Sequence, residues 1–340
     1  MLVQSKLIRR IKIFVAFPLF CTAMLAAEAQ AGIMLDGVSE SQYLAFASQP
    51  QFAGSGSVFS EAIDQQTQQV IRVSHGSGTL IAPDWVLTAG HVGIPSFFQP
   101  GGTGPTYAIS QRIAHPVFVA NGDSAFAINF GFDVALLHLS TPVTSSPYAN
   151  IYRGSNEVNL GAAITGFGVG GFGADGGAAG LPQASRAGTN RIDYIFPSLP
   201  IGPNGVTQAF NSLFATDFDS PTSIGTPGQY NTLASFGSDA APSPLEYQLA
   251  NQDSGGGVYV FENGNWFLAG INSGVQSQND TLGTGNTQLF GYGALGVYTR
   301  VSSFQSFIDI NALSVPEPGS FVLLSVIATV AIFARRRTST

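Results

Sequence analysis

Short runs of apolar residues between residues 56 and 314 predict a chain built mainly from β-strands. The runs are about four to eight residues long, are rich in Val, Ile, Leu and Thr, and are separated by Gly, Pro, Asn and Asp. Such a pattern is typical of an all-β barrel or sandwich. The runs fall into two sets, at about 56–155 and about 156–314, so we expect two β-units.

The end of this region has a helical period instead. Val301, Phe304, Phe307 and Ile308 are spaced as on one face of a helix, and neighbouring serines suit its N-terminal cap. We therefore expect a C-terminal helix and a folded region that ends near Leu313.

Stretches rich in Gly, Ser, Asn, Phe and Pro, at 121–130, 168–183 and 202–243, are predicted to be surface loops. The last is long for a compact domain, which suggests a functional loop or a misread element. Its Asp217 and Asp219 alternate as in a calcium-binding turn. Because the full calcium-loop spacing is missing, two acids that cap a turn are the simpler interpretation, and we predict no metal site.

Residues 1–31 have the pattern of a secretory signal peptide. A basic start precedes an apolar run, Ile13–Ala27, and then Ala29-Gln30-Ala31, a small-x-small cleavage site before Gly32. A transmembrane helix is the alternative, but about 15 apolar residues fall short of the roughly 20 that span a bilayer. We therefore predict that the protein is exported.

Composition changes this picture in two ways. The single cysteine, Cys21, lies in the predicted signal peptide, so the exported part would have no disulfides. At about 280 residues, the exported part is large enough to bury a core without them.

The exported part is also acidic. Between residues 32 and 314 there are six arginines and no lysine against eighteen acidic residues. A domain this acidic is repelled by phosphate backbones, so we exclude nucleic acid as a main partner.

Three residues far apart in the chain have the chemistry of a nucleophilic site. A serine hydroxyl is a weak nucleophile that needs a base within hydrogen-bond reach and a third group to orient that base. Ser254 in QDSGGG is the candidate nucleophile, His91 in TAGHV the candidate base and Asp133 in FDVALLHL its partner. Their order along the chain is one of the known orders of such triads.

The segments around these residues resemble the trypsin/chymotrypsin family. The similar segments, in the family's order, are GSGTLIAPDWVLTAGHV, RIAHPVF, GFDVALLHLSTPV, TGFG, QDSGGG, AGINSG and GVYTRVSSFQSFI. The resemblance implies an all-β fold of two packed six-stranded antiparallel β-barrels at 56–314 with a C-terminal helix. It implies a serine endopeptidase that forms an acyl-enzyme, needs no cofactor and acts on a protein or peptide substrate. His115 and His138 lie off the family's catalytic positions, and we interpret them as structural.

The resemblance also implies an oxyanion hole and a specificity pocket. The oxyanion donors would be the backbone N–H groups of Ser254 and Gln252, where the family normally has glycine. Such a departure would slow the enzyme, because losing one donor lowers the rate by roughly 10²–10³.

The implied specificity pocket has no carboxylate at its base or in its walls. We therefore expect cleavage after uncharged residues. The predicted pocket residues are Gln248, Ser273, Val275 and Gly296.

Residues 32–55 show no long period, and we interpret them as an N-terminal arm or pro-segment. In the family, cleavage often frees an amino terminus that pairs with the acid before the nucleophile, here Asp253. No Lys or Arg lies between Gly32 and Gln69, so a tryptic activation site is absent there and the partner of Asp253 stays open.

Residues 315–340 combine Val315-Pro316-Glu317-Pro318, an apolar run at 321–334 and three arginines. They resemble the PEP-CTERM sorting signal of Gram-negative exopolysaccharide producers. The resemblance implies a membrane partner through this segment, with the arginines on the cytoplasmic side, and processing by an exosortase-type enzyme. A permanent tail anchor is the alternative, although about 14 apolar residues are few for stable spanning.

These patterns together predict a protease exported from a Gram-negative bacterium and associated with the cell envelope, then with the cell surface or matrix. A catalytically silent binding module and a matrix or adhesion protein are the alternatives. The first is suggested by Gln252 and the missing activation site, the second by the sorting tail and the Gly-rich loops.

Overall fold

The computed structural model describes residues 32–123, 131–168, 170–176, 181–197, 209–221, 223–224, 230–276 and 290–313. The predicted signal peptide and the predicted sorting segment lie outside these residues, as do large parts of the predicted loops. Within the described part of the chain, no helix is both long and apolar enough to cross a membrane.

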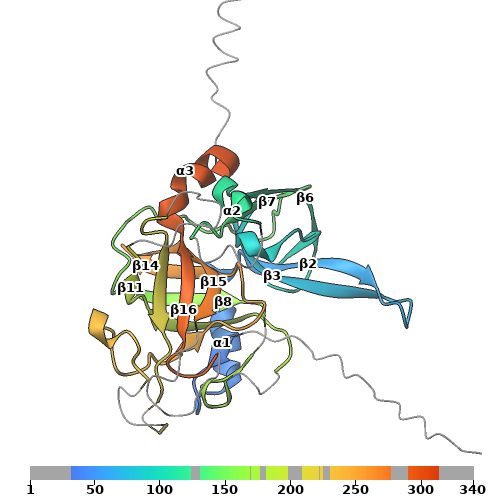
Figure 1. The fold of residues 1–340 in the computed structure, drawn as a ribbon. Coiled ribbons are helices and arrows are strands. Elements are labelled where there is room, and N and C mark those ends of the chain that lie inside the picture. Colours follow the sequence, from blue (N-terminus) through green and yellow to red (C-terminus); the bar gives the residue numbers. More distant parts are fainter. Residues whose placement is uncertain are drawn as a thin grey trace, which may run out of the picture.

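The first β-unit is a closed barrel of six antiparallel strands (Figure 1). Its strands pair in the order β2-β3-β4-β7-β6-β5, and β2 and β3 extend beyond the barrel as a long hairpin. Fully buried Val, Leu and Phe side chains fill its interior, which explains the apolar runs in the sequence. The strands are β2 (Ser55–Ile63), β3 (Val70–Ala82), β4 (Trp85–Thr88), β5 (Phe97–Pro100), β6 (Tyr107–Ala114) and β7 (Ala135–Leu139).

The second β-unit is a seven-stranded sheet that curls into a half-barrel. Its order is β10-β8-β14-β15-β16-β12-β11. The two end strands, β10 and β11, are consecutive in the chain, and the N–H of Asp193, which lies between them, donates to the carbonyl of Ala215 at 3.0 Å. The strands are β8 (Gly161–Gly166), β10 (Arg186–Arg191), β11 (Tyr194–Ile195), β12 (Leu213–Asp217), β14 (Gly257–Glu262), β15 (Asn265–Gln276) and β16 (Leu295–Arg300).

The predicted chymotrypsin-like fold class is thereby confirmed. The structure refines it in one respect, because only the first unit is a closed six-stranded barrel among the described residues. The predicted C-terminal helix is also present. It consists of a 3₁₀ turn at Val301–Phe304, α3 at Gln305–Ile308 and a wider π-type turn at Asp309–Leu313.

The N-terminal segment is folded against the second unit. β1 (Ile33–Met34) lies between β13 (Tyr247–Gln248) and β9 (Gly171–Phe172) in a small sheet. α1 (Glu40–Ala47) packs on β10 (Figure 1). The sequence shows no helical period here because α1 buries only Tyr43 and Ala47, one turn apart.

The remaining helical elements are short and connect strands. They are α2 at Pro116–Ala120 and 3₁₀ turns at Pro50–Phe52, Gly90–Val92, Gly173–Asp175 and Ala234–Phe236.

A buried ion pair fixes the end of the second unit to the loop that enters it. Arg300, at the end of β16, donates to Glu157 through Nε at 2.9 Å and Nη2 at 2.6 Å. Ser302 also donates to Glu157, at 2.7 Å. Glu157 is fully buried, and a buried carboxylate is costly in free energy unless partners such as these compensate it.

We predict that Glu157→Gln lowers the free energy of unfolding by about 3–5 kcal/mol, because it leaves the Arg300 charge buried without a counter-charge. Asp309→Asn is the matched control. It breaks the half-exposed pair with Arg153 and should lower this free energy by at most about 1 kcal/mol. Urea unfolding of both variants measures the difference, and equal effects would contradict the prediction.

Candidate active site

The three candidate catalytic residues come from both β-units. His91 lies in the 3₁₀ turn that follows β4, and Asp133 lies two residues before β7, which pairs with β4. Ser254 lies in the turn that precedes β14 in the second unit. The three side chains therefore meet only when the two units pack together.

The structure brings these three side chains into one hydrogen-bonded chain. His91 Nδ1 is 2.7 Å from Asp133 Oδ2, and His91 Nε2 is 2.7 Å from Ser254 Oγ. The backbone N–H of His91 also donates to Asp133 Oδ1, at 2.9 Å. Asp133 is fully buried, so it holds the imidazole in one orientation with its Nδ1–H toward the carboxylate. Nε2 is then the nitrogen that can accept the serine proton.

Ser273 has a position that the sequence does not indicate. We predicted it in the wall of a specificity pocket, and its residue does border the cavity described below, but its hydroxyl donates to Asp133 Oδ2. The hydroxyl of Thr299 donates to the carbonyl of Asp133, at 2.9 Å. Strands β15 and β16 thus hold the acid of the first unit. Nothing in the spacing of these residues signals this contact.

The turn that carries Ser254 is fixed from both units. The carbonyl of Ser254 accepts the N–H of Ser77 from β3, at 2.7 Å. Gly255 and Gly256 donate to the carbonyls of Asn272 and Asp253, at 2.8 and 2.9 Å. These bonds leave the nucleophile little freedom to move away from His91.

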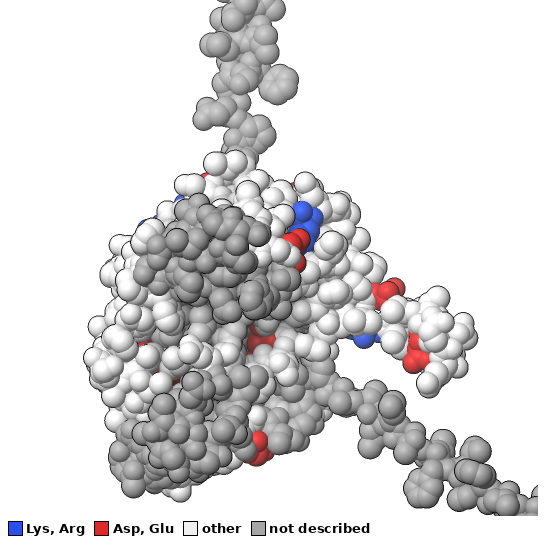
Figure 2. All heavy atoms as spheres, in the orientation of Figure 1, with Lys and Arg blue, Asp and Glu red and all other residues white. Residues whose placement is uncertain are grey.

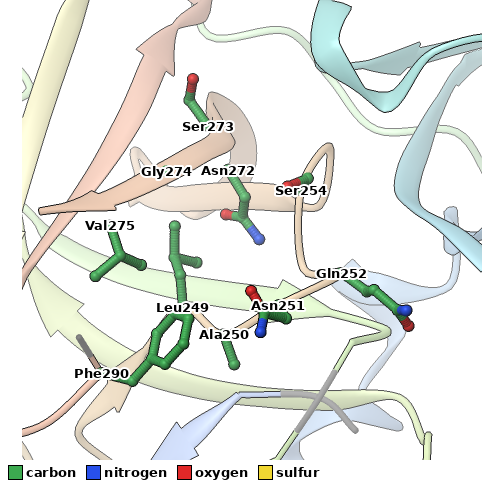
Figure 3. Close-up of a pocket in the computed structure, with 10 residues that line it drawn as sticks. All are labelled: Leu249, Ala250, Asn251, Gln252, Ser254, Asn272, Ser273, Gly274, Val275 and Phe290. Carbon is green, nitrogen blue, oxygen red and sulfur yellow. The ribbon is translucent and has the colours of Figure 1, made fainter. Parts of the chain in front are cut away.

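The two predicted oxyanion donors flank Asp253 in this turn. The backbone N–H groups of Gln252 and Ser254 donate to no acceptor among the described residues. Gln252 has a φ of 70°, the left-handed conformation that glycine adopts without strain. Its backbone therefore follows the path that a glycine would take. Its side chain points away from Ser254 (Figure 3).

The carboxylate of Asp253 lies in the interior behind the nucleophile. It accepts the N–H groups of Gly168 and Gly32 at 3.0 Å and that of Ala250 at 2.9 Å. Burial raises the pKa of this carboxyl to about 7, against the opposing effect of these bonds. Gly32 is the first residue after the predicted cleavage site, so the open partner of Asp253 has a candidate.

A cavity of about 150 Å³ opens beside Ser254 (Figure 3). No charged side chain lines it, and Val275 and Phe290 form an apolar side. The lining residues are Leu249, Ala250, Asn251, Gln252, Ser254, Asn272, Ser273, Gly274, Val275 and Phe290.

The other two residues predicted for the pocket do not line this cavity. Gln248 is fully buried, and its side-chain amide bonds the carbonyl of Ala294 and the N–H of Leu249, at 2.9 and 2.7 Å. Gly296 lies against it, since a Cβ at this position would be 2.8 Å from Gln248 Oε1.

Few charged side chains lie on the face shown in Figure 2, where uncharged residues predominate among the described ones. The described residues contain no group of three or more His, Cys, Asp or Glu side chains that could hold a metal ion. Asp217, which the sequence placed in a possible calcium-binding turn, accepts the N–H of Leu233 and the hydroxyl of Ser238, both at 2.9 Å.

The two histidines that we interpret as structural lie away from the triad. The side chain of His115 caps α2, and that of His138 contacts Asp84 on the first barrel.

Residues 56–187 match the family model described as Trypsin, a range that contains His91 and Asp133 but ends before Ser254. Among solved structures, the chain is similar to neuropsin, a serine protease expressed in the limbic system of mouse brain. That match has 16% sequence identity and a TM-score of 0.47, and it covers 77% of this chain and 96% of neuropsin. The search of curated proteins found no match. The match to the trypsin family model supports the interpretation of this chain as a trypsin-like serine protease.

We predict that Gln252→Gly raises the free energy of unfolding by about 1 kcal/mol, because a left-handed backbone strains glutamine but not glycine. Urea unfolding measures this change, and hydrolysis of a peptide substrate should be retained. Asn251→Gly is the matched control. Asn251 has no positive φ, so glycine there should lower this free energy by up to about 1 kcal/mol. A destabilised or inactive Gln252→Gly variant would refute the prediction.

Proposed function

We propose that this protein is an exported serine endopeptidase that hydrolyses peptide bonds through an acyl-enzyme. The observation that carries the proposal is the continuous chain of hydrogen bonds from Asp133 through His91 to the hydroxyl of Ser254, with both distances at 2.7 Å. The trypsin-domain match supports it independently, because that match rests on sequence. A binding scaffold has no need of all three groups in this geometry.

The first half of the reaction forms the acyl-enzyme. Ser254 Oγ attacks the carbonyl carbon of the substrate while its proton passes to His91 Nε2. The N–H groups of Gln252 and Ser254 donate hydrogen bonds to the carbonyl oxygen, on which negative charge develops. The tetrahedral intermediate then collapses, the C–N bond breaks, and His91 returns the proton to the leaving amine.

The second half repeats these steps with water. A water molecule gives a proton to His91 Nε2 and attacks the ester carbon; the ester bond to Ser254 Oγ breaks, and the serine regains its proton. Asp133 orients the ring and stabilises the imidazolium that forms twice in each cycle. The bond from Ser273 to Asp133 supports this role, because it helps to hold the carboxylate toward the ring.

The shape and polarity of the cavity support cleavage after small or medium uncharged residues. A Lys or Arg side chain would find no carboxylate among the residues that line it. Val275 and Phe290 narrow it and favour apolar side chains.

The export route rests on the sequence alone. Residues 1–31 would direct export as a signal peptide, and residues 315–340 would hold the protein at the membrane until an exosortase-type enzyme processes it. Release would then place the protease at the cell surface or in the matrix.

The triad is tested with a fluorophosphonate probe, which reacts only with an activated serine, and with a casein assay. The unaltered protein should be labelled and Ser254→Ala should not. Asp133→Asn should lower kcat by about 10⁴, because the amide no longer selects the productive tautomer of His91. Asp84→Asn is the matched control, since Asp84 contacts His138 at 3.3 Å outside this cluster. A folded protein that is not labelled would favour the binding-module alternative.

We predict that Val275→Gly enlarges the pocket and raises the ratio of kcat/KM for peptides with Phe to those with Ala at the cleaved position by about tenfold. Val297→Ala removes apolar volume from a neighbouring strand that does not line the cavity and should leave this ratio unchanged. A peptide library measures the preference. Dominance of basic residues at the cleaved position would contradict the assignment.

A further inference from the structure

Gln252 supplies one of the two predicted oxyanion donors, yet few bonds hold it in place. Among the described residues it makes one hydrogen bond, which its carbonyl accepts from the hydroxyl of Ser77 at 3.2 Å. Its side chain points away from Ser254 (Figure 3), and the buried Oε1 atom has no hydrogen-bond partner. The direction of its N–H is therefore set by the backbone and by Ser77.

The backbone of Gln252 has the conformation of a turn that favours glycine. The N–H of Asp253 donates to the carbonyl of Ala250 at 3.2 Å, which closes a β-turn with Asn251 and Gln252 at its centre. The φ of Gln252 is 70°, whereas Asn251 has no positive φ. A positive φ at the third position alone is typical of a type II turn, in which glycine is preferred there.

A second turn with the same ends is open to glutamine. In a type I turn the central peptide is reversed, and the third residue has a negative φ that a side chain tolerates without strain. Reversal of the peptide between Asn251 and Gln252 would turn the N–H of Gln252 to the opposite side, because the N–H and the preceding C=O share one plane. Gln252 can therefore donate to the oxyanion from one of the two turns only.

Two contacts favour the type II form. The carbonyl of Asn251 lies close to Gly168, where a Cβ would be 2.1 Å from this oxygen, so it has room only because residue 168 has no side chain. The other contact is the bond from Ser77 to the carbonyl of Gln252, which fixes the plane of the following peptide. The N–H of that peptide donates to Ala250, so the plane is held at both ends.

Ser77 holds this carbonyl from the first barrel. It lies on β3 and is fully buried. Its hydroxyl accepts the N–H of Phe167 at 2.9 Å, which directs the hydroxyl proton to the carbonyl of Gln252. Its backbone N–H donates to the carbonyl of Ser254 at 2.7 Å. One residue therefore binds the carbonyls of both residues that supply the oxyanion donors.

We propose that Ser77 is a positioning residue of this active site: its hydroxyl fixes the carbonyl of Gln252 and keeps the turn in the type II form, with the N–H of Gln252 directed at the oxyanion. This inference rests on the proposed function. Without the hydroxyl, the plane that follows Gln252 is held at its N–H alone. Gln252 can then relieve the strain of its left-handed backbone by reversal of the preceding peptide.

The proposal is tested by steady-state kinetics with a peptide substrate. Ser77→Ala should lower kcat about tenfold, the population ratio to which the strain of one left-handed residue corresponds. KM should change by less than about twofold, because the oxyanion forms only in the transition state. The Ki of a peptide trifluoromethyl ketone, whose adduct with the serine carries an oxyanion, should rise by the factor by which kcat falls.

Ser55→Ala is the matched control. Ser55 is also a buried serine of the first barrel, and its hydroxyl bonds that of Tyr259 in the second unit at 2.8 Å. This substitution should lower the urea midpoint of unfolding as Ser77→Ala does, and it should leave kcat unchanged. An equal loss of kcat in both variants would give Ser77 a merely structural role and overturn the proposal.

The strain at Gln252 provides a second test. In a Gln252→Gly background the type II turn is unstrained, so Ser77→Ala should lower kcat there by less than about twofold. Removal of the hydroxyl should thus cost at least about fivefold more activity beside glutamine than beside glycine. Equal losses in the two backgrounds would show that the hydroxyl acts independently of this strain, and they would refute the proposal.

Crystal structures report on the turn whether or not the protein is active. The φ of Gln252 should be negative in Ser77→Ala and near 70° in Ser55→Ala. A positive φ in Ser77→Ala, or a kcat equal to that of the unaltered protein, would refute the role of Ser77 and leave the protease assignment standing. Absent fluorophosphonate labelling of the unaltered protein would refute the protease assignment, and the φ of Gln252 would still decide whether Ser77 holds the turn.

Discussion

The hydrogen bond from the N–H of Ser77 to the carbonyl of Ser254 joins the first barrel to the nucleophile of the second unit. The hydroxyl of Ser77 extends this link, because it donates to the carbonyl of Gln252 and accepts the N–H of Phe167. A single residue of β3 therefore sets the turn against both units. The 2.7 Å contact between His91 and Ser254 depends on this registration, since each belongs to a different unit.

The site also depends on buried charges that must be compensated. Asp133 and Asp253 are both fully buried, one beside His91 and one behind Ser254. Asp133 is surrounded by donors from the imidazole, the backbone and Ser273. Asp253 has three backbone donors, but burial still raises its pKa.

Glycine has a comparable role at the site, because backbone atoms approach one another closely there. A Cβ at Gly255 would lie 2.2 Å from the carbonyl oxygen of Ser77, and one at Gly168 would lie 2.1 Å from that of Asn251. Gln252 is the exception, since it adopts a glycine-like φ and carries a side chain that points out of the turn. The backbone strain is therefore confined to Gln252, and the neighbouring residues of the turn keep their positions.

The sequence by itself determined the strand-rich fold, its two units, the C-terminal helix and the identity of the three residues that meet at 2.7 Å. These features are local or ordered along the chain: strand periodicity, helical spacing, and short motifs around His91, Asp133 and Ser254. Only the tertiary structure decided that Ser273 bonds Asp133, that Gln248 turns into the interior, and that Gly32 reaches Asp253. Gly32 and Asp253 are 221 positions apart, and their contact is made by the packing of β1 between two strands, which no local pattern encodes.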